Sequence, residues 1–340
     1  MSLKLAVPLI LIVALLGGAV GAGGALVVGD EKGDARGRQG EQPPVRPPSS
    51  ADVAALDARI ANFEHRLSRL ERRKRGEQRE KGRRGARASS RREPAVVWAV
   101  GDGANGGAAA KALAQYIASA RPDRFLYLGD VYEHGTRAEF KRSYRSVYRR
   151  LDRVTAPTPG NHDWPNASEG YLPYWKRTLK RKVRSYYSFR AGGWQLLSLN
   201  SEDAHGPGSR QVRWLRRAAA GPGDCRLAFW HRPRFSAGSH GDQSDIEPLW
   251  GALRAKAKIV VAGHDHNMQR LKQIDGITQF VSGAGGKSHY ELDRSYPRLD
   301  FANDRDDGAL RLELRPGRAR YAFVSVTGKV LDSGALRCRG

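Results

Sequence analysis

The sequence is poor in cysteine and in acidic residues. Two cysteines in 340 residues, Cys225 and Cys338, exclude a disulfide-dense scaffold and a cysteine-rich zinc module. Asp and Glu number 35 against 59 Lys and Arg, which gives a formal net charge of +24. Because 40% of the residues are hydrophobic, we expect a packed core rather than a disordered chain or a polytopic membrane protein. The charge leaves three kinds of partner open: nucleic acid, an anionic membrane surface and a phosphorylated substrate.

Residues 1–28 are dominated by one uncharged segment. No charged residue occurs from Leu5 to Gly29, and this run is long enough to span a bilayer, which needs about 20 apolar residues. We interpret it as a signal-anchor or, alternatively, as a cleaved signal peptide. The excess of Lys and Arg on its C-terminal side favours a cytoplasmic location for the rest of the chain, whereas a short N-terminal apolar segment is typical of export. We expect a chain that is membrane-anchored and faces the exterior, or that is secreted.

Three segments are predicted to connect this region to a folded domain. Residues 29–50 are rich in proline, glycine and charge, which indicates a disordered linker. Residues 51–73 carry apolar residues at spacings of three and four, which predicts an amphipathic helix or a short coiled coil that would form a homo-oligomer. Residues 74–94 form a basic linker that would interact with anionic lipid or act as a solvated spacer. The apolar positions are Val53, Leu56, Ile60, Phe63, Leu67 and Leu70.

Residues 95–340 are predicted to form one α/β domain. Near-continuous apolar runs indicate buried strands, and helix-prone stretches lie between them. Residues 185–201 resemble a β-hairpin turned at Gly192-Gly193, and three or more antiparallel strands are expected over 276–334. Because alternating strands and helices give way to strands, we expect one sheet packed on another with helices outside. The expected buried strands are 95–101, 125–130, 225–231 and 258–266, and the expected helices are 105–120, 140–151 and 211–220.

Polar side chains follow the predicted strands. The carboxyl ends of strands in α/β sheets point into one crevice, so residues from five segments are expected to meet there. Asp, Asn and His ligands without a thiolate suit Mn, Fe or Zn. A carboxylate such as Asp130 can bridge two cations, which bind phosphate oxygens and lower the pKa of water so that a metal-bound hydroxide is the nucleophile. The residues concerned are Asp102, Asp130, Asn161, His231, His264 and His266.

The order of these motifs resembles that of the calcineurin-like metallophosphoesterases, and most closely their purple-acid-phosphatase-like branch. The resemblance covers about residues 95–335 and implies a four-layer α/β/β/α sandwich. It also implies that Asp102 and His266 hold one metal ion, that Asp130 bridges, and that Asn161, His231 and His264 hold the second. By the same resemblance His162 would be the general acid or a residue that stabilises the transition state. The motifs are Gly101-Asp102, Gly129-Asp130, Gly160-Asn161-His162-Asp163, His231 and Gly263-His264-Asp265-His266.

Two departures from the family pattern affect the first metal site. Ala104 stands where most of the superfamily has a histidine. The purple acid phosphatases also lack that histidine. Those enzymes carry a tyrosine three residues after the bridging aspartate, whereas here Tyr132 is at plus two and Glu133 at plus three. Tyr132, Glu133 or water could therefore complete the first site.

Three further residues are candidates near the metals, and the two cysteines are candidates for a disulfide. Asp163 and His240 are expected to bind metal or to hold the ligands in place, although a surface-loop position is an equal alternative for His240. Arg232 is a candidate for phosphate binding, with a solvated arginine as the alternative. Cys225 and Cys338 would form a disulfide if the chain is exported and would stay reduced in the cytoplasm.

The sequence therefore predicts a two-metal phosphoester hydrolase, foremost an acid-phosphatase-like phosphomonoesterase acting on a phosphorylated small molecule. A phosphodiesterase or nuclease is the alternative within the fold, because residues 95–340 carry 40 Lys and Arg against 24 Asp and Glu. No ladder of aromatic and basic residues marks a nucleic-acid track, which argues against nucleic acid as a partner. A membrane-tethered, non-catalytic envelope-binding protein with a decayed site is the third hypothesis.

Overall fold

The computed structural model describes residues 93–339 and six earlier positions. It divides the chain into two compact units, Met1–Arg72 and Arg73–Gly340. The predicted segments 1–28 and 29–50, the apolar seam of 51–73 and residues 74–92 lie outside the described residues. None of the helices in the described part of the chain has the length and apolar character needed to cross a bilayer. The six earlier positions, all helical and exposed, are Asn62, His65, Ser68, Arg69, Glu71 and Arg72.

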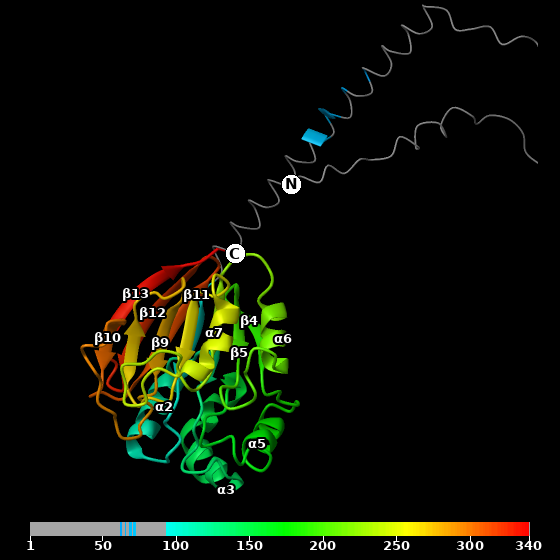
Figure 1. Ribbon diagram of the computed structural model, residues 1–340. Helices are drawn as coiled ribbons and strands as arrows, with labels where there is room; N and C mark the ends of the chain where they lie inside the picture. Colours follow the sequence, from blue (N-terminus) through cyan, green and yellow to red (C-terminus); the bar gives the residue numbers. More distant parts are fainter. Residues whose placement is uncertain (1–61, 63–64, 66–67, 70, 73–92, 340) are drawn as a thin grey trace, which may run out of the picture. The chain divides into compact units, whose positions relative to one another are not determined.

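The first sheet of the second unit combines the start of the domain with its end (Figure 1). Its strand order is β13-β12-β11-β1-β2-β3, in which β1, β2 and β3 are parallel and β11 to β13 are antiparallel. The C-terminal strands therefore extend a sheet begun by the first strand. The bounds are β1 Ala95–Val100, β2 Arg124–Tyr127, β3 Thr155–Pro157, β11 Gly308–Arg315, β12 Arg318–Ser325 and β13 Val330–Arg337.

The second sheet contains the middle of the chain. Its order is β10-β8-β9-β7-β6-β5-β4, and β5, β6, β7 and β9 run parallel. The predicted hairpin forms from β4 and β5, with Gly192 and Gly193 at φ 56° and 83° in its turn, where glycine is favoured. The bounds are β4 Tyr187–Ala191, β5 Trp194–Ser198, β6 Arg226–Phe229, β7 Ile259–Ala262, β8 Met268–Leu271, β9 Thr278–Ser282 and β10 Leu299–Asn303.

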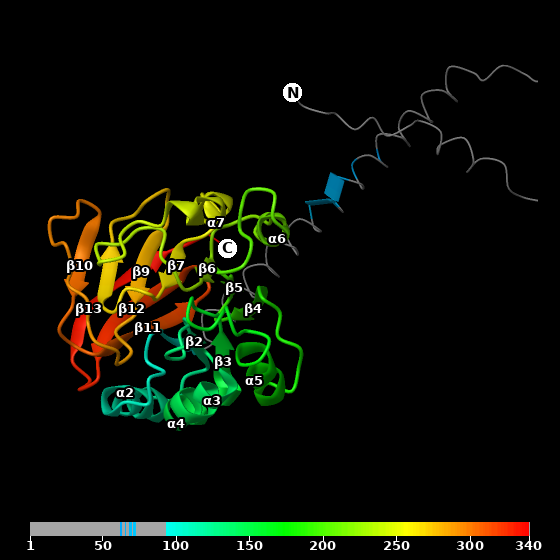
Figure 2. The same cartoon turned by 60° about the horizontal axis from the view of Figure 1, so that its bottom comes forward.

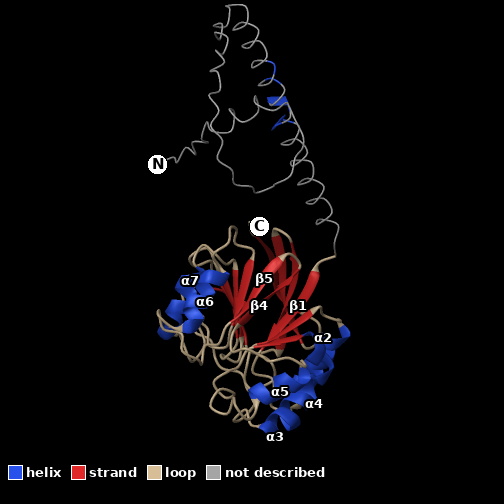
Figure 3. Cartoon of the chain, turned by 90° about the vertical axis from the view of Figure 1, so that its right-hand side faces the viewer, coloured by secondary structure: helices blue, strands red, loops and turns tan. Residues whose placement is uncertain are grey.

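Helices pack on the outer face of each sheet (Figures 2 and 3). On the first sheet they form one core with Trp98 and Val100, and on the second they form another with Leu197 and Val260. Ser209 caps α6 by accepting a hydrogen bond from the Val212 amide. The first group is α2 Ala108–Ser119, α3 Arg137–Glu139, η3 Phe140–Tyr144, α4 Arg145–Tyr148, η4 Arg149–Val154 and α5 Tyr171–Thr178; the second is α6 Arg210–Ala218, η5 Ser244–Ile246 and α7 Glu247–Leu253.

A third core lies between the two sheets. Strand β1 shows why, because its side chains alternate: Val97 and Ala99 face the other sheet, whereas Trp98 and Val100 face the helices. Phe229 and Val261 enter the same central core from β6 and β7. The expected α/β domain with two packed sheets is therefore confirmed.

The end of the chain was only partly predicted. Strands β8 and β10 and helix α7 were not expected, because their short sequences show no clear periodicity. The expected antiparallel strands over 276–334 form as β11, β12 and β13, whereas β9 pairs antiparallel with β8 and parallel with β7 in the second sheet. Helix α2 also begins three residues later than predicted, since Asn105 accepts a hydrogen bond from the Gly107 amide and forms a turn there.

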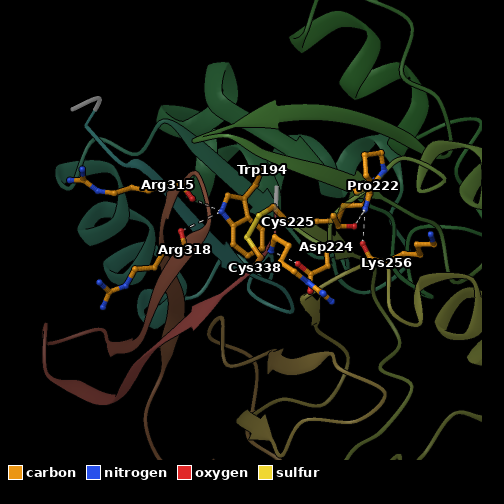
Figure 4. Close-up of a disulfide and its surroundings, with 11 residues drawn as sticks. Trp194, Pro222, Asp224, Cys225, Lys256, Arg315, Arg318 and Cys338 are labelled. Atoms are coloured by element: carbon orange, nitrogen blue, oxygen red, sulfur yellow. Dashed lines mark hydrogen bonds between the residues drawn. A yellow bond between two sulfur atoms is a disulfide. The ribbon is translucent and has the colours of Figure 1, made fainter. Parts of the chain in front are cut away.

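A disulfide joins Cys225 to Cys338, with the Cα atoms 5.0 Å apart. Figure 4 shows it beside Trp194, whose indole Nε1 donates to the Arg315 carbonyl at 2.8 Å. The Arg339 carbonyl accepts hydrogen bonds from the amides of Asp224 and Cys225. Of the two alternatives, the disulfide is therefore the one that forms. It ties the end of β13 to the start of β6.

Candidate metal centre

Buried acidic and imidazole groups meet at the carboxyl ends of the strands. Asp102 follows β1, Asp130 lies beyond β2 and His231 lies beyond β6. The candidate ligand atoms of these three residues lie within 4.8 Å of one another, and their exposed fractions are 0%, 2% and 0%. Two carboxylates and an imidazole in one dry site need a compensating positive charge, so this cluster has the character of a cation site.

Backbone carbonyls fix the orientation of two histidines. The Nδ1 of His231 lies 2.8 Å from the Leu128 carbonyl, and the Nδ1 of His266 lies 2.8 Å from the Ser288 carbonyl. Each carbonyl requires a proton on Nδ1, which leaves the Nε2 lone pair for another partner. Both Nε2 atoms point to the carboxylates, at 3.4 Å from Asp130 and 3.7 Å from Asp102 respectively.

The Nε2 of His231 faces a group of electron-rich atoms. It lies 2.8 Å from Oδ1 of Asn161 and 3.1 Å from Nδ1 of His264, in addition to Asp130. Lone pairs at these distances repel unless a proton or a cation lies among them. The group comprises the amide, imidazole and carboxylate donors expected for the second metal ion, and it fits a transition-metal cation.

Tyr132 lies with the other half of the candidate ligands. Its hydroxyl is 3.1 Å from Oδ1 of Asp102 and 2.9 Å from Nε2 of His266. Glu133 instead forms an ion pair with Lys287. Of the two side chains considered for the first metal site, the structure therefore directs Tyr132 towards Asp102 and His266, and it directs Glu133 to a lysine.

The backbone is strained at three of these positions. Asp102, Asp130 and His264 have φ values of 62°, 69° and 74°, a left-handed region that costs energy for residues other than glycine. The preceding Gly129 has φ 105°, and a Cβ there would lie 2.6 Å from the Gly160 amide nitrogen. The glycines of the Gly-Asp and Gly-Asn-His-Asp motifs thus let two loops approach closely, and the strain is concentrated at the centre.

Burial shifts the ionisation of the site: it favours the metal-binding form of two histidines and opposes ionisation of Asp102. It raises the pKa of Asp102 to about 8, and it lowers that of His264 to about 2 and that of His266 to about 4. Burial opposes ionisation of Asp130, but the neighbouring His231 and His162 lower its pKa to about 2. The two histidines with lowered pKa values are held neutral, which is the form that binds metals.

His162 stands at the mouth of the centre. Its Nδ1 lies 2.5 Å from the Glu133 carbonyl, and its Nε2 lies 3.9 Å from Oδ2 of Asp130. The ring packs against Tyr132 at a centroid distance of 4.8 Å. Because 33% of the side chain is exposed, Nε2 can reach a molecule that enters from solvent.

Asp163 and His240 contact the cluster through its supporting loops. The Asp163 carboxylate accepts hydrogen bonds from the amides of Asp130, Val131 and Gly160, each at 2.9 Å, so it joins two loops. His240 lies 2.8 Å from buried Asp265 and packs on His264 at a centroid distance of 4.0 Å. Both residues therefore hold candidate ligands in place.

Arg232 is engaged elsewhere. Its guanidinium forms ion pairs with Glu202 and Asp245, at 3.2 and 2.8 Å, and donates to Gln243 at 3.1 Å. These acceptors orient it within the protein, so the geometry does not present it as a free phosphate-binding group.

Three residues at the centre were not singled out from the sequence. Tyr290 stacks on His266 at 4.1 Å, and Lys287 Nζ lies 4.2 Å from the centre of the Tyr132 ring. Both come from the loop between β9 and β10, which has no recognisable motif. Asp265 is fully buried and binds Ser236 and His240, and only its place inside Gly-His-Asp-His could have indicated it.

Comparison with known proteins agrees with this geometry. Mouse (Mus musculus) tartrate-resistant acid phosphatase type 5 is 28% identical over 138 residues, which cover 37% of this chain and 42% of that protein. Purple acid phosphatase 3 of Arabidopsis thaliana is 30% identical over 112 residues, 31% of this chain and 30% of that protein. The chain thus matches less than half the length of these curated relatives.

Solved structures show the same fold. GAP50, described as the anchor in the inner membrane complex of Plasmodium, superposes with a TM-score of 0.63 at 16% identity, over 73% of this chain and 90% of that one. Purple acid phosphatase PPD1 from yellow lupin (Lupinus luteus) gives 0.58 at 18% identity, over 71% and 53%. The sequence profile of the calcineurin-like phosphoesterases matches residues 96–268, which is half of the chain. With its strand-end carboxylates and histidines gathered in one buried centre, the chain belongs to the calcineurin-like phosphoesterase family.

Proposed function

We propose that this chain is a metal-dependent phosphoester hydrolase that acts foremost on phosphomonoesters of small molecules. The observation that supports it best is the meeting of Asp102, Asp130 and His231 within 4.8 Å in a buried site. The acid phosphatases among its relatives favour monoesters over the alternative, a phosphodiesterase or nuclease of the same fold.

Two groups of side chains suit two cations, with Mn, Fe and Zn as the candidates. Asp102, His266 and Tyr132 would hold one, Asn161, His231 and His264 the other, and Asp130 would contact both. These are oxygen and nitrogen donors of the kinds that such metals take. When bound, the cations would supply Lewis acidity that activates water and neutralises the phosphoryl oxygens.

His162 is proposed as the general acid. The Glu133 carbonyl holds its Nδ1, so Nε2 is the atom available to donate a proton to the leaving oxygen. The partial exposure of the His162 side chain supports this role, because a leaving group could reach Nε2 from the solvent side. His240, which Asp265 orients, is a candidate for a second contact with substrate.

We also propose that the domain works outside the reducing cytoplasm, either anchored to a membrane through residues 1–28 or secreted. Disulfides persist in oxidising compartments, so the Cys225–Cys338 bond supports this location. Association of the chain through residues 51–73 stays a prediction from the apolar spacing.

The test is hydrolysis of p-nitrophenyl phosphate and of bis-p-nitrophenyl phosphate by the full chain loaded with Mn, Fe or Zn. We expect faster turnover of the monoester, and His162→Ala should lower kcat by roughly 10²–10⁴-fold. The matched control is His65→Ala, an exposed histidine outside the catalytic domain.

Each result separates the hypotheses. A higher rate on the diester would assign the chain to the phosphodiesterases. No hydrolysis of either substrate with any of these metals would favour the non-catalytic envelope-binding protein. Equal kcat values for the native chain and His162→Ala would refute the role of His162.

A further inference from the structure

A basic groove lies on the helical face of the first sheet, outside the candidate metal centre. It has a volume of about 590 Å³ and is formed by α3, η3, α4 and η4 on one side and by α5 on the other. We call it the cationic groove. In Figures 2 and 3 these helices lie together along the outer face. Its basic residues are Arg137, Lys141, Arg145, Arg149, Arg153 and Arg177, and Asp152, Tyr174 and Thr178 complete the lining.

Five of these cations form a ladder with a spacing of four residues, from Arg137 to Arg153. A regular α-helix would turn such positions gradually around its surface, because it has 3.6 residues per turn. The helix is irregular here, because η3 is a π-helical turn and η4 is a 3-10 helix, and all five cations line the same groove. The buried rings of Phe140, Tyr144 and Tyr148 follow the same period on the side that faces the core.

The groove cations form no ion pairs among the described residues. None of the six forms an ion pair with another residue of the described 93–339 region, and Asp152 is the one carboxylate in the lining. Other surface arginines in that region behave differently: Arg254 and Arg270 each bind two carboxylates. What distinguishes the groove is that six such cations line one cavity with a single carboxylate.

Like charges four residues apart on a helix destabilise it. The folded domain carries four such pairs in succession between Arg137 and Arg153. Since the described residues provide no compensating anions beyond Asp152, the charges are best matched by a ligand that is itself anionic.

The shape of the ladder indicates what kind of anion fits. Sixteen residues of helix span about 24 Å at 1.5 Å per residue, which is several times the width of one phosphate group. The one aromatic ring of the lining, Tyr174, is buried, so the groove offers no exposed ring on which a nucleobase could stack. A chain of regularly spaced phosphates would match both features.

We propose that the cationic groove binds inorganic polyphosphate, a linear polyanion with phosphate groups along its backbone. The contacts are to backbone charge and not to bases. The first groove residue, Arg137, follows Tyr132 closely in the sequence. The Glu139 carboxylate also accepts hydrogen bonds from the amides of Glu133 and His134, which ties the start of the groove to the loop that carries Tyr132. The binding does not depend on the proposed hydrolysis.

The experiment measures binding of end-labelled inorganic polyphosphate to the full chain by fluorescence anisotropy over a range of salt concentrations, with gel analysis to verify that the polymer stays intact. The groove variant is Arg145→Gln/Arg149→Gln/Arg153→Gln. The matched control, Arg210→Gln/Arg216→Gln/Arg217→Gln, removes the same charge from exposed positions of α6. Because the two variants lose the same charge, a difference in binding between them isolates the groove.

We expect the groove variant to bind at least about tenfold more weakly and to show a salt slope lower by about two to three, while the control stays close to the native chain. Orthophosphate should fail to displace the polymer at equal phosphate concentration. Equal losses in the two variants would overturn the proposal. The same proteins are also tested for binding to anionic vesicles and to neutral phosphatidylcholine vesicles. If the groove variant kept its affinity for polyphosphate but lost the preference for anionic vesicles, the proposal would be overturned and the groove assigned to a membrane surface.

Discussion

The disulfide gives the most quantitative prediction of stability. Cys225 and Cys338 are 113 residues apart in sequence, so their bond closes a long loop in the unfolded chain. The chain-entropy relation for a loop of this length gives a stabilisation of about 5 kcal/mol. For a domain of this size, 1 kcal/mol corresponds to a change in Tm of about 2–4 °C, so loss of the bond should lower Tm by roughly 10–20 °C.

The folded structure should survive this loss. Strand β13 remains paired with β12 from Arg318 to Val324, and the amides of Asp224 and Cys225 still bind the Arg339 carbonyl. The effect is therefore expected on the free energy of unfolding and not on the fold.

The assay is thermal and urea unfolding of the full chain, followed by the fluorescence of buried tryptophans such as Trp194. Three samples are compared: oxidised native chain, native chain reduced with dithiothreitol, and Cys225→Ser/Cys338→Ser without reductant. The last two should unfold together, well below the first. A reduced chain that unfolds within about 2 °C of the oxidised chain would refute the reasoning.

Three further predictions concern the site and the groove. Replacement of Glu139 by Ala leaves the Glu133 and His134 amides without their acceptor and should cost roughly 2–3 kcal/mol of unfolding free energy in urea titrations; no loss would contradict its anchoring role. Burial raises the pKa of Asp152 from 3.8 to about 6, so the fold loses stability as pH rises between these two values. Asp152→Asn should therefore be about 1–2 kcal/mol more stable than the native chain at about pH 8 but equal to it at about pH 4. A constant difference between these pH values would exclude titration of Asp152 as the cause. Tyr132→Phe should weaken one of two metal-binding steps about 10–100-fold in a calorimetric titration, and unchanged affinities would exclude Tyr132 as a ligand.

The sequence predicted the parts of the fold that depend on local pattern. The apolar runs before Asp102 and His231 are buried strands, and the Gly192-Gly193 turn joins a hairpin as expected. Such features follow from periodicity and turn chemistry, which short segments carry by themselves. Strand β8 carries no such signal, and its pairing with β9 and β10 is set by tertiary contacts.

The candidate site was predictable in its residue types and less so in its geometry. Motif order indicated which strands would supply Asp, Asn and His, but spacing alone left Tyr132 and Glu133 as equal alternatives. The structure separates them because the Tyr132 hydroxyl meets Asp102, whereas Glu133 meets Lys287 from a distant loop. The pairing of Cys225 with Cys338 was undetermined for the same reason, since the distance between Cα atoms is a property of the folded chain.

The most direct test of the metal centre is the metal content of the full chain after loading with Mn, Fe or Zn and gel filtration, compared with Asp130→Asn. This substitution keeps the shape of the side chain and removes the charge of the carboxylate proposed to contact both ions. The geometry predicts two ions per native chain and a clear loss in the variant. A native chain that retains no metal, or a variant that retains as much as the native chain, would contradict the account.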